Sequence, residues 1–402
     1  MTNSLTRIGS ANMYDRTVNN LAERQAKLAS MMESTPAGKR VVRASDDPVA
    51  AAQAERARTR MDRTEADQKA LNAQVSIIKS GESTLGAANE ALQQFRTLVV
   101  NSGNGTYSQT ERDALVAQMV SLRDQIAGHA NATDSNGLPL FRGLGSAEQP
   151  LQGGSFLSQS GQTSSSVNGI PNTLDGTAAF MNVPTGNGVL AVNQGATNTG
   201  KAWTDIGQIT DPGAAAAAAT TVPPINITFS VAADGTTTYS IAGAAAVPYK
   251  SGDTITVAGM GLKITGTPAD GDSFTIGASE RSDLFSVLDQ AINVIRSSGN
   301  PDGTTASGVL AHGMAKALAE IDTGLNRMQA VRSFAGDLLN RADTLTDHMS
   351  ARSVQLEADR SAAEDVDMIA ALSELKSLQT NYSAALQSYA QIQKLSLFDY
   401  IG

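Results

Sequence analysis

The side chains that could bind a metal or carry out acid–base chemistry are few and widely separated in this 402-residue chain. Its three histidines, His129, His312 and His348, match neither the HxxxH nor the HExxH spacing that presents two imidazoles to one zinc ion. We therefore expect them to be polar helix residues. Cysteine is absent, which excludes disulfides, thiolate nucleophiles and cysteine-ligated metals.

The acidic clusters are better explained by local structure than by catalysis. Asp270-Gly271-Asp272 lacks the carboxylate spacing and closing Glu of an EF-hand, so it predicts a turn and not a calcium site. Asp47 stands before Pro48, where its carboxylate can cap a helix whose first position suits proline. Asp46 adds negative charge at the positive end of the same helix.

No other motif indicates an active site. Gly38-Lys39 has neither the upstream glycine nor the preceding strand of a phosphate-binding loop. No GxSxG nucleophile setting occurs. The sequence therefore predicts no catalytic, cofactor-binding or metal site, and we do not expect an enzyme.

Composition narrows the partners and the compartment. The net charge is −9 and the pI about 4.9, which argues against nucleic acid or an anionic membrane surface as a partner. No apolar run reaches the roughly 20 residues that a membrane-spanning helix needs, so we expect no membrane insertion. The first residues lack the apolar core and cleavage site of a signal peptide, so export with a cleaved signal is not expected.

Both ends of the chain carry the stripe of a coiled-coil helix. Steps of four and three residues place apolar side chains on one face, and neither stripe can be buried within its own helix. The two ends are therefore predicted to pair and to drive self-assembly. The predicted assembly interface is Tyr14, Val18, Leu21, Leu28, Met32, Leu372, Leu375, Leu378, Tyr382, Leu386, Tyr389, Ile392 and Leu395.

Opposite charges on the two ends favour their alignment. Residues 1–40 hold six basic and three acidic side chains, net +3, and residues 361–402 hold two basic and five acidic, net −3.

Arginine marks a separate domain in the middle of the chain. None occurs between Arg142 and Arg281, and the same interval is rich in Gly, Ser and Thr. The expected fold class is α + β: a long helical, coiled-coil-like bundle formed by both chain ends, with a small, mainly β insert. The predicted domains are a terminal assembly domain (1–45 with 357–402), a helical rod (46–145 with 281–356) and the insert (146–280).

Apolar periodicity predicts the elements of the rod and the insert. Helices are expected over 48–100, 109–131, 284–295 and 314–349, the last interrupted chiefly by Arg332. In the insert, alternation over 225–231 and 239–241 around Asp234-Gly235 predicts a hairpin. Three more strands are expected at 255–257, 262–264 and 274–276, whereas residues 146–200 offer only scattered apolar anchors.

Several phrases resemble the flagellin superfamily and, within it, the members at the hook–filament junction. They are Gly38-Lys39-Arg40-Val41, Ser45-Asp46-Asp47-Pro48-Val49-Ala50-Ala51, Tyr14 with Asn19-Asn20-Leu21, residues 130–134 leading to 140–143, the phrase 266–274, and the ending Leu395-Ser396-Leu397-Phe398-Asp399-Tyr400-Ile401. The resemblance is thin from 144 to 250. Ala44 and Pro36-Ala37 depart from the usual pattern, which leaves the geometry of the loop between the terminal and inner helices open.

The resemblance implies a structural subunit of the bacterial flagellum that joins the hook to the flagellin filament. Its implied partners are further copies of itself in a ring, the first hook-associated protein, flagellin and a cytoplasmic export chaperone, and its implied export route is the flagellar type III apparatus. Two alternatives remain open. One is a flagellin, and the other is a secreted adhesin or enzyme whose insert is active.

Overall fold

The computed structural model describes residues 10–103, 107–142, 151–152, 155–156, 170–171, 173–297 and 307–401. The chain divides into two compact units. One, here called the terminal unit, comprises residues 1–70 and 345–402, and the other, the central unit, comprises 71–344. The two longest helices, α2 (Pro48–Ser102) and α7 (Ser307–Glu364), run through both units. The three-domain division expected from the sequence remains a prediction.

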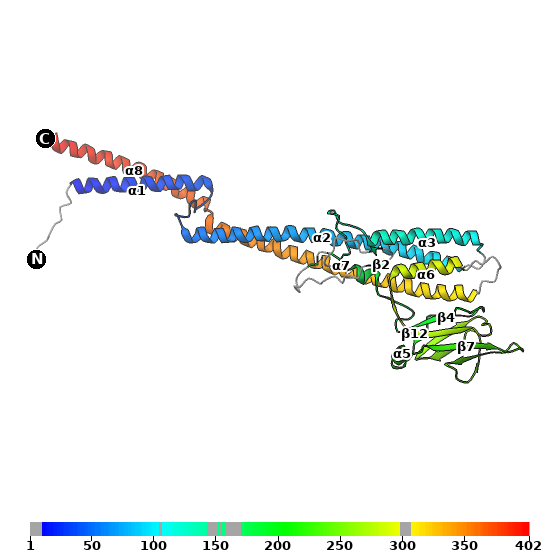
Figure 1. Cartoon of the computed structure of the whole chain (residues 1–402). Coiled ribbons are helices and arrows are strands. Elements are labelled where there is room, and N and C mark those ends of the chain that lie inside the picture. The colour runs from blue at the N-terminus through cyan, green and yellow to red at the C-terminus, as the bar shows by residue number, and fades with distance from the viewer. Residues whose placement is uncertain are drawn as a thin grey trace, which may run out of the picture. The chain divides into compact units, whose positions relative to one another are not determined.

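In the terminal unit, both ends of the chain are helical and lie against each other. Helix α1 (Ser10–Ala37) contacts α8 (Met368–Ile401), as Figure 1 shows with α1 in blue and α8 in red. The first turns of α2 and the last turns of α7 complete this unit. No helix in the described part of the chain is both long enough and apolar enough to cross a bilayer.

Helix α1 ends in a Schellman motif centred on a glycine. Gly38 has φ +67°, a left-handed conformation that costs least without a side chain. Its N–H donates to the Thr35 carbonyl at 3.1 Å, and the Lys39 N–H donates to the Ser34 carbonyl at 3.2 Å. These two bonds satisfy the last carbonyls of α1 and turn the chain toward α2.

In the central unit, α2 continues as the spine of a helical bundle. Its Leu71, Ile78, Leu85, Leu92 and Val99, spaced one heptad apart, are all buried, and Val75 on the same helix is half-buried. Helix α3 (Gln109–Ala130) packs against α6 (Leu284–Ser297), and α7 covers the same core. The bundle is coloured cyan, blue and yellow in Figure 1.

Ion pairs connect the bundle helices at their polar edges. Arg332, which interrupts the apolar stripe of α7, pairs with Glu82 of α2 at 2.7 Å. Arg96 pairs with Asp322 at 2.6 Å. The polar interruption in the sequence therefore has a partner on the neighbouring helix.

The insert is a two-sheet β domain, and the hairpin and the three other strands expected from the sequence are all present. One sheet has the order β4 (Leu190–Gln194), β12 (Ser273–Ala278), β7 (Ile225–Val231), β8 (Thr237–Ile241) and β9 (Val247–Pro248). The other joins β10 (Thr254–Val257), β11 (Met260–Thr265) and β5 (Trp203–Thr204), with β6 (Gln208–Ile209) also on β11. Phe229, Phe274, Leu262 and Ile264 contribute to one shared buried core.

Several elements of the insert were not expected, among them β4, β5, β6 and α5. Strand β4 lies in the segment where the sequence offered only scattered anchors, and the two-residue strands β5 and β6 are too short to show periodicity. Helix α5 (Pro212–Ala219) is formed by the alanine run and capped by Asp211. The expected turn at Asp270-Gly271-Asp272 is confirmed, because the Asp272 N–H donates to the Ala269 carbonyl at 3.2 Å and Gly271 has φ +83°. The Asp272 carboxylate is buried and accepts from the Thr199 and Gly200 N–H groups.

The insert leaves and rejoins the bundle side by side. Strand β3 (Val183–Pro184) pairs with β13 (Arg281–Ser282), and the Thr185 N–H donates to the Glu280 carbonyl at 2.9 Å. Helix α4 (Gly176–Phe180) precedes β3, and β1 (Leu151–Gln152) and β2 (Ser155–Phe156) pair as a separate small hairpin. Residues 183–185 and 280–282 are thus neighbours, so the β domain formed by residues 186–279 begins and ends at one place.

Candidate assembly interface

On α1, the predicted stripe is only partly covered within one chain. Leu21 and Leu28 are half-buried, whereas Val18 is 40% exposed and Met32 is 58% exposed. Thr17 and Met31, the residues just before these two, are half-buried instead. The covered face of α1 is therefore rotated slightly from the predicted stripe of apolar residues. The side chain of Tyr14 lies outside the described residues.

On α8, the covered face has the predicted spacing. Leu375, Leu378, Tyr382 and Tyr389 are half-buried, on the helix that contacts α1. Leu372 is 53% exposed and Leu386 is 41% exposed, both on the flank of that face. The side chains of Ile392 and Leu395 lie outside the described residues. Which of these residues meet another subunit remains a prediction.

The loop between α1 and α2 is held by two aspartates. Asp46 accepts hydrogen bonds from the Val42 and Arg43 N–H groups at 3.2 and 2.8 Å, which closes the loop on itself. Asp47 caps α2 by accepting from the Ala50 N–H at 3.0 Å, and Pro48 is the first residue of that helix. This capping bond is the first cause of the lowered pKa of Asp47.

The same loop is hydrogen-bonded to the point where α7 ends. The Arg40 N–H donates to the Glu364 carbonyl at 2.8 Å, and the Val366 N–H donates to the Gly38 carbonyl at 3.0 Å. Lys39 and Asp365 form an antiparallel bridge. Residues 38–41 and 364–366, more than 300 positions apart, thus form a short ladder within the terminal unit.

Glu364 is the electrostatic centre of this ladder. Its carboxylate, 8% exposed, accepts from Lys39, from Arg58 at 2.6 Å and from Arg360 at 3.3 Å. Burial alone would raise the pKa of Glu364, but the Lys39 ammonium and the Arg58 guanidinium outweigh it and hold the pKa below its ordinary value. The carboxylate therefore stays charged at neutral pH and ties the loop to α2 and α7.

Sequence reasoning did not find this cluster. Lys39 was noted only as part of a rejected phosphate loop, and Glu364 was not singled out. The partners are separated by 325 positions, so no local spacing connects them. The one signal was the phrase Gly38-Lys39-Arg40-Val41, which carried the family resemblance without showing its contact.

A groove of about 420 Å³ lies beside this cluster, between the loop and the first turns of α2. Most of its lining is small and apolar, and Arg43, Glu55, Arg58 and Glu364 supply the polar part. It contains no histidine and no nucleophilic side chain. Its chemistry suits an apolar side chain and not a reaction.

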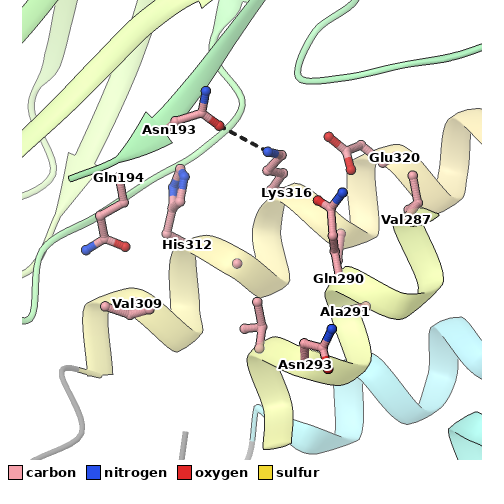
Figure 2. Close-up of a pocket in the computed structure, with 13 residues that line it drawn as sticks. Asn193, Gln194, Val287, Gln290, Ala291, Asn293, Val309, His312, Lys316 and Glu320 are labelled. Atoms are coloured by element: carbon pink, nitrogen blue, oxygen red, sulfur yellow. Dashed lines mark hydrogen bonds between the residues drawn. The ribbon is translucent and has the colours of Figure 1, made fainter. Parts of the chain in front are cut away.

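A second pocket, of about 360 Å³, lies in the central unit where β4 meets α6 and α7 (Figure 2). His312 is buried there, with Nδ1 3.0 Å from the Thr204 hydroxyl and Nε2 3.2 Å from the Val192 carbonyl. Lys316 donates to Asn193 at 3.1 Å, shown dashed in Figure 2. These contacts hold the edge strand β4 of the insert on α7.

The three histidines thus differ in setting. All three lie on helices, as expected: His129 on α3, and His312 and His348 on α7. His312 differs from the other two in being buried. Burial lowers the pKa of His312, and the carbonyls of Thr204 and Val192 oppose this only in part. Within the described residues, no group of three His, Cys, Asp or Glu side chains could hold a metal ion.

Comparisons with known proteins agree on one family. Residues 8–146 match the bacterial flagellin N-terminal helical region, and residues 318–401 match the bacterial flagellin C-terminal helical region. The flagellar hook-associated protein 3 of Escherichia coli is 24% identical over 397 residues, 96% of each chain. That of Salmonella typhimurium is 33% identical over 153 residues, 36% of this chain and 46% of the relative.

A solved structure has the same fold. The flagellar junction protein FlgL of Legionella pneumophila superposes with a TM-score of 0.64 at 26% identity, covering 72% of this chain and 99% of that one. The fold is therefore shared over about three-quarters of this chain.

Proposed function

The chain belongs to the flagellin family of bacterial flagellar proteins, and from that premise we propose that it is the subunit that joins the hook to the filament. The observation that carries this proposal is the match to hook-associated protein 3 over 96% of both chains, insert included. The likeness to a junction-protein structure supports the same role.

The architecture of the terminal unit suits a subunit that assembles. Two helices from opposite ends of the chain lie together and leave large apolar side chains exposed on α8. Isolated helix pairs of this kind are marginal in water and gain stability by packing against further helices. The chain's work is therefore mechanical: it presents helices to its neighbours and carries no chemistry of its own.

We also propose its partners and its route. Copies of the chain form a ring, with the first hook-associated protein on the hook side and flagellin on the filament side. A cytoplasmic chaperone covers the C-terminal helix before export, which uses the flagellar type III apparatus and no cleaved signal peptide. The absence of cysteine suits a chain that is exported unfolded and folds outside the cell.

The proposed division of labour follows the three predicted domains. Residues 1–45 with 357–402 make the assembly contacts, 46–145 with 281–356 form the rod, and 146–280 form an appended β domain. The tight pairing of β3 with β13 supports an insert that was added to a continuous bundle.

Immunogold electron microscopy of intact flagella tests the function. We expect one labelled band where hook meets filament, and a deletion strain with complete hooks that sheds flagellin into the medium. Label along the whole filament, or a deletion strain with a shortened filament and normal junctions, would make the chain a flagellin instead.

A further inference from the structure

The pocket where β4 meets α6 and α7 contains a buried carboxylate that lacks a partner for one of its oxygens. Glu320 is 2% exposed, and its Oε1 atom is buried and has no hydrogen-bond partner. Burial raises the pKa of Glu320, and the charge of Lys316 and the Gly186 N–H oppose this only in part. Because a buried polar atom is costly unless it is hydrogen-bonded, this oxygen requires a donor that the described part of the chain does not supply.

A lysine one helical turn away does not supply that donor. Lys316 and Glu320 are four positions apart on α7, a spacing at which opposite charges commonly pair. Lys316 donates instead to the Asn193 side chain at 3.1 Å, and among the described residues neither charge belongs to an ion pair. An ammonium has three donors, and Asn193 uses only one of them. One pocket thus holds a cation and a carboxylate that do not contact each other.

The pocket around this pair has the size and the lining of a small-molecule site. Its volume of about 360 Å³ lies in the range of ligand pockets, which are mostly apolar with a few polar groups that fix orientation. Val287 and Ala291 of α6 and Ala317 of α7, all buried, form an apolar floor. Gln290 lines the pocket and is exposed, so the site can be reached from solvent (Figure 2).

Regular structure holds the walls of the pocket in place. Helices α6 and α7 meet closely at Gly313, where an added Cβ would lie 2.6 Å from Cγ1 of Val294. Strand β4 is held on α7 by the contact of His312 Nε2 with the Val192 carbonyl at 3.2 Å. Sites on helices and strands are held more precisely than sites on loops, so the charged pair has a fixed frame.

We propose that this pocket binds a free α-amino acid with an apolar side chain. The ammonium of the ligand donates to Glu320, and the carboxylate of the ligand accepts from Lys316. The two protein charges are not in contact, yet Lys316 lies near enough to lower the pKa of Glu320, and a small zwitterion can bridge such a gap. The side chain of the ligand lies over the floor at Ala291 and Ala317.

Ligands of other classes fit the pair less well. An amine without a carboxylate would bring a second positive charge to Lys316, and a carboxylic acid would leave Glu320 without a donor. A metal ion is not favoured, because no group of three His, Cys, Asp or Glu side chains in the described residues could hold one. Gln194, whose buried amide also has no hydrogen-bond partner, lies on the other side of His312 from Lys316 in Figure 2 and is not part of the pair.

Isothermal titration calorimetry of the full chain with L-valine, L-leucine and L-methionine at pH 7.5 tests the site. We expect at least one of the three to bind. For the tightest binder, the matched amine without the carboxylate and the matched acid without the ammonium should each bind roughly tenfold more weakly or worse, because each loses a charge-assisted hydrogen bond. Glycine, which lacks the apolar side chain, should also bind more weakly. If none of the three binds, or if the amine binds equally well, the proposal is wrong.

Charge-removing variants locate the binding and separate it from a structural role. Glu320→Gln should raise the melting temperature of the free chain, because it removes an unpaired buried charge, and should abolish binding. Lys316→Met should also bind at least roughly tenfold more weakly, and it carries the test if Glu320→Gln does not fold.

The exposed Glu90→Gln and Lys263→Met, which change charges outside the pocket, are the matched controls and should bind as the native chain does. Native affinity in Glu320→Gln or Lys316→Met, or a loss of affinity in the controls as large as in these variants, would overturn the assignment. The site lies in the central unit, so this result is independent of the proposed role at the junction.

Discussion

At the scale of single residues, Glu364 is the group on which most of the terminal unit's electrostatics depend. Its buried carboxylate pairs with Lys39, Arg58 and Arg360, and its backbone carbonyl accepts a hydrogen bond from the Arg40 N–H. The lysine and the arginines are partly exposed and can be solvated if the carboxylate is lost. The cost of losing it is therefore set by the unpaired hydrogen bonds more than by stranded charge.

We predict that Glu364→Gln lowers the free energy of unfolding of the terminal unit by about 1–3 kcal/mol. The amide keeps the shape but loses the negative charge, and it replaces one of the two acceptor oxygens with an NH₂ group that cannot accept from a cation. Urea denaturation followed by circular dichroism measures the loss. Glu357→Gln, which removes an exposed partner of Arg360 alone, is the control and should change the value little. Equal effects of the two variants would contradict the assignment.

His312 predicts a pH dependence in the central unit. Burial lowers its pKa below the ordinary 6.5, so the folded chain binds this proton less readily than the unfolded chain. The contribution of His312 to the free energy of unfolding is therefore fully present above pH 6.5. It is lost as the pH falls from 6.5 toward the lowered pKa of His312 in the folded chain. The positive charge of the nearby Lys316 also lowers the pKa of His312.

The measurement compares urea unfolding of the native chain and His312→Gln between pH 7.5 and 5. Glutamine can keep one donor and one acceptor for Val192 and Thr204 but does not titrate in this range. We expect the variant to lose less stability on acidification than the native chain, and the exposed His348→Gln to behave as the native chain does. Parallel pH profiles for native and His312→Gln would show that His312 does not contribute.

At the scale of elements, α8 is the helix whose apolar faces the function requires. Leu378 is half-buried on the side turned to α1, in a helix pair that is otherwise largely exposed. A carboxylate there would have to be desolvated once neighbouring helices cover this face. The effect should be largest in the assembled state, where neighbours cover the helix.

We predict that Leu378→Asp is exported in normal amounts, leaves the thermal unfolding of the soluble monomer nearly unchanged, and abolishes filament attachment and swimming. Gln379→Asp, one residue further on the exposed side, is the control and should swim. Hydrogen exchange of the monomer should show little protection across 370–391. Strong protection there, or a swimming Leu378→Asp strain, would be evidence against assembly-coupled ordering of α8.

Elements with strong local patterns could be predicted from the sequence, and elements defined by distant contacts could not. Heptads gave α2 and its buried face, and alternation around Asp234-Gly235 gave the β7–β8 hairpin. Strand β4 was missed because its pairing with β12 lies about 80 positions away and its flanks are Gly- and Asn-rich. The Glu364 cluster was missed for the same reason at a longer range.

At the scale of the whole molecule, the insert is predicted to be separable from the bundle. Pro184 and Arg281 are paired neighbours in β3 and β13, so a short linker can join them without moving either. We predict that replacing residues 185–280 with a Gly/Ser linker leaves the helical bundle folded. Cooperative thermal unfolding at 222 nm checks this, and a gradual, non-cooperative loss of signal would show that the bundle needs the insert.

A matched control uses the exposed loop at the tip of the insert. Replacing only residues 242–246, between β8 and β9, should leave both the bundle and the β domain intact. Comparison with the larger deletion shows the effect of removing all contacts between the β domain and α7, among them those of His312 with Thr204 and Val192 and that of Lys316 with Asn193. We expect that effect to be a modest fall in melting temperature.

The ladder between residues 38–41 and 364–366 has a consequence for when the molecule folds. Closing a loop of some 325 residues is entropically slow, and contacts so far apart in sequence form late. The central unit can fold from its own residues, whereas the terminal unit must wait until both ends of the chain are free to meet. If the chain is exported through a narrow channel as proposed, the terminal unit can form only after residues 364–366 have emerged, and association with neighbouring subunits is delayed until then.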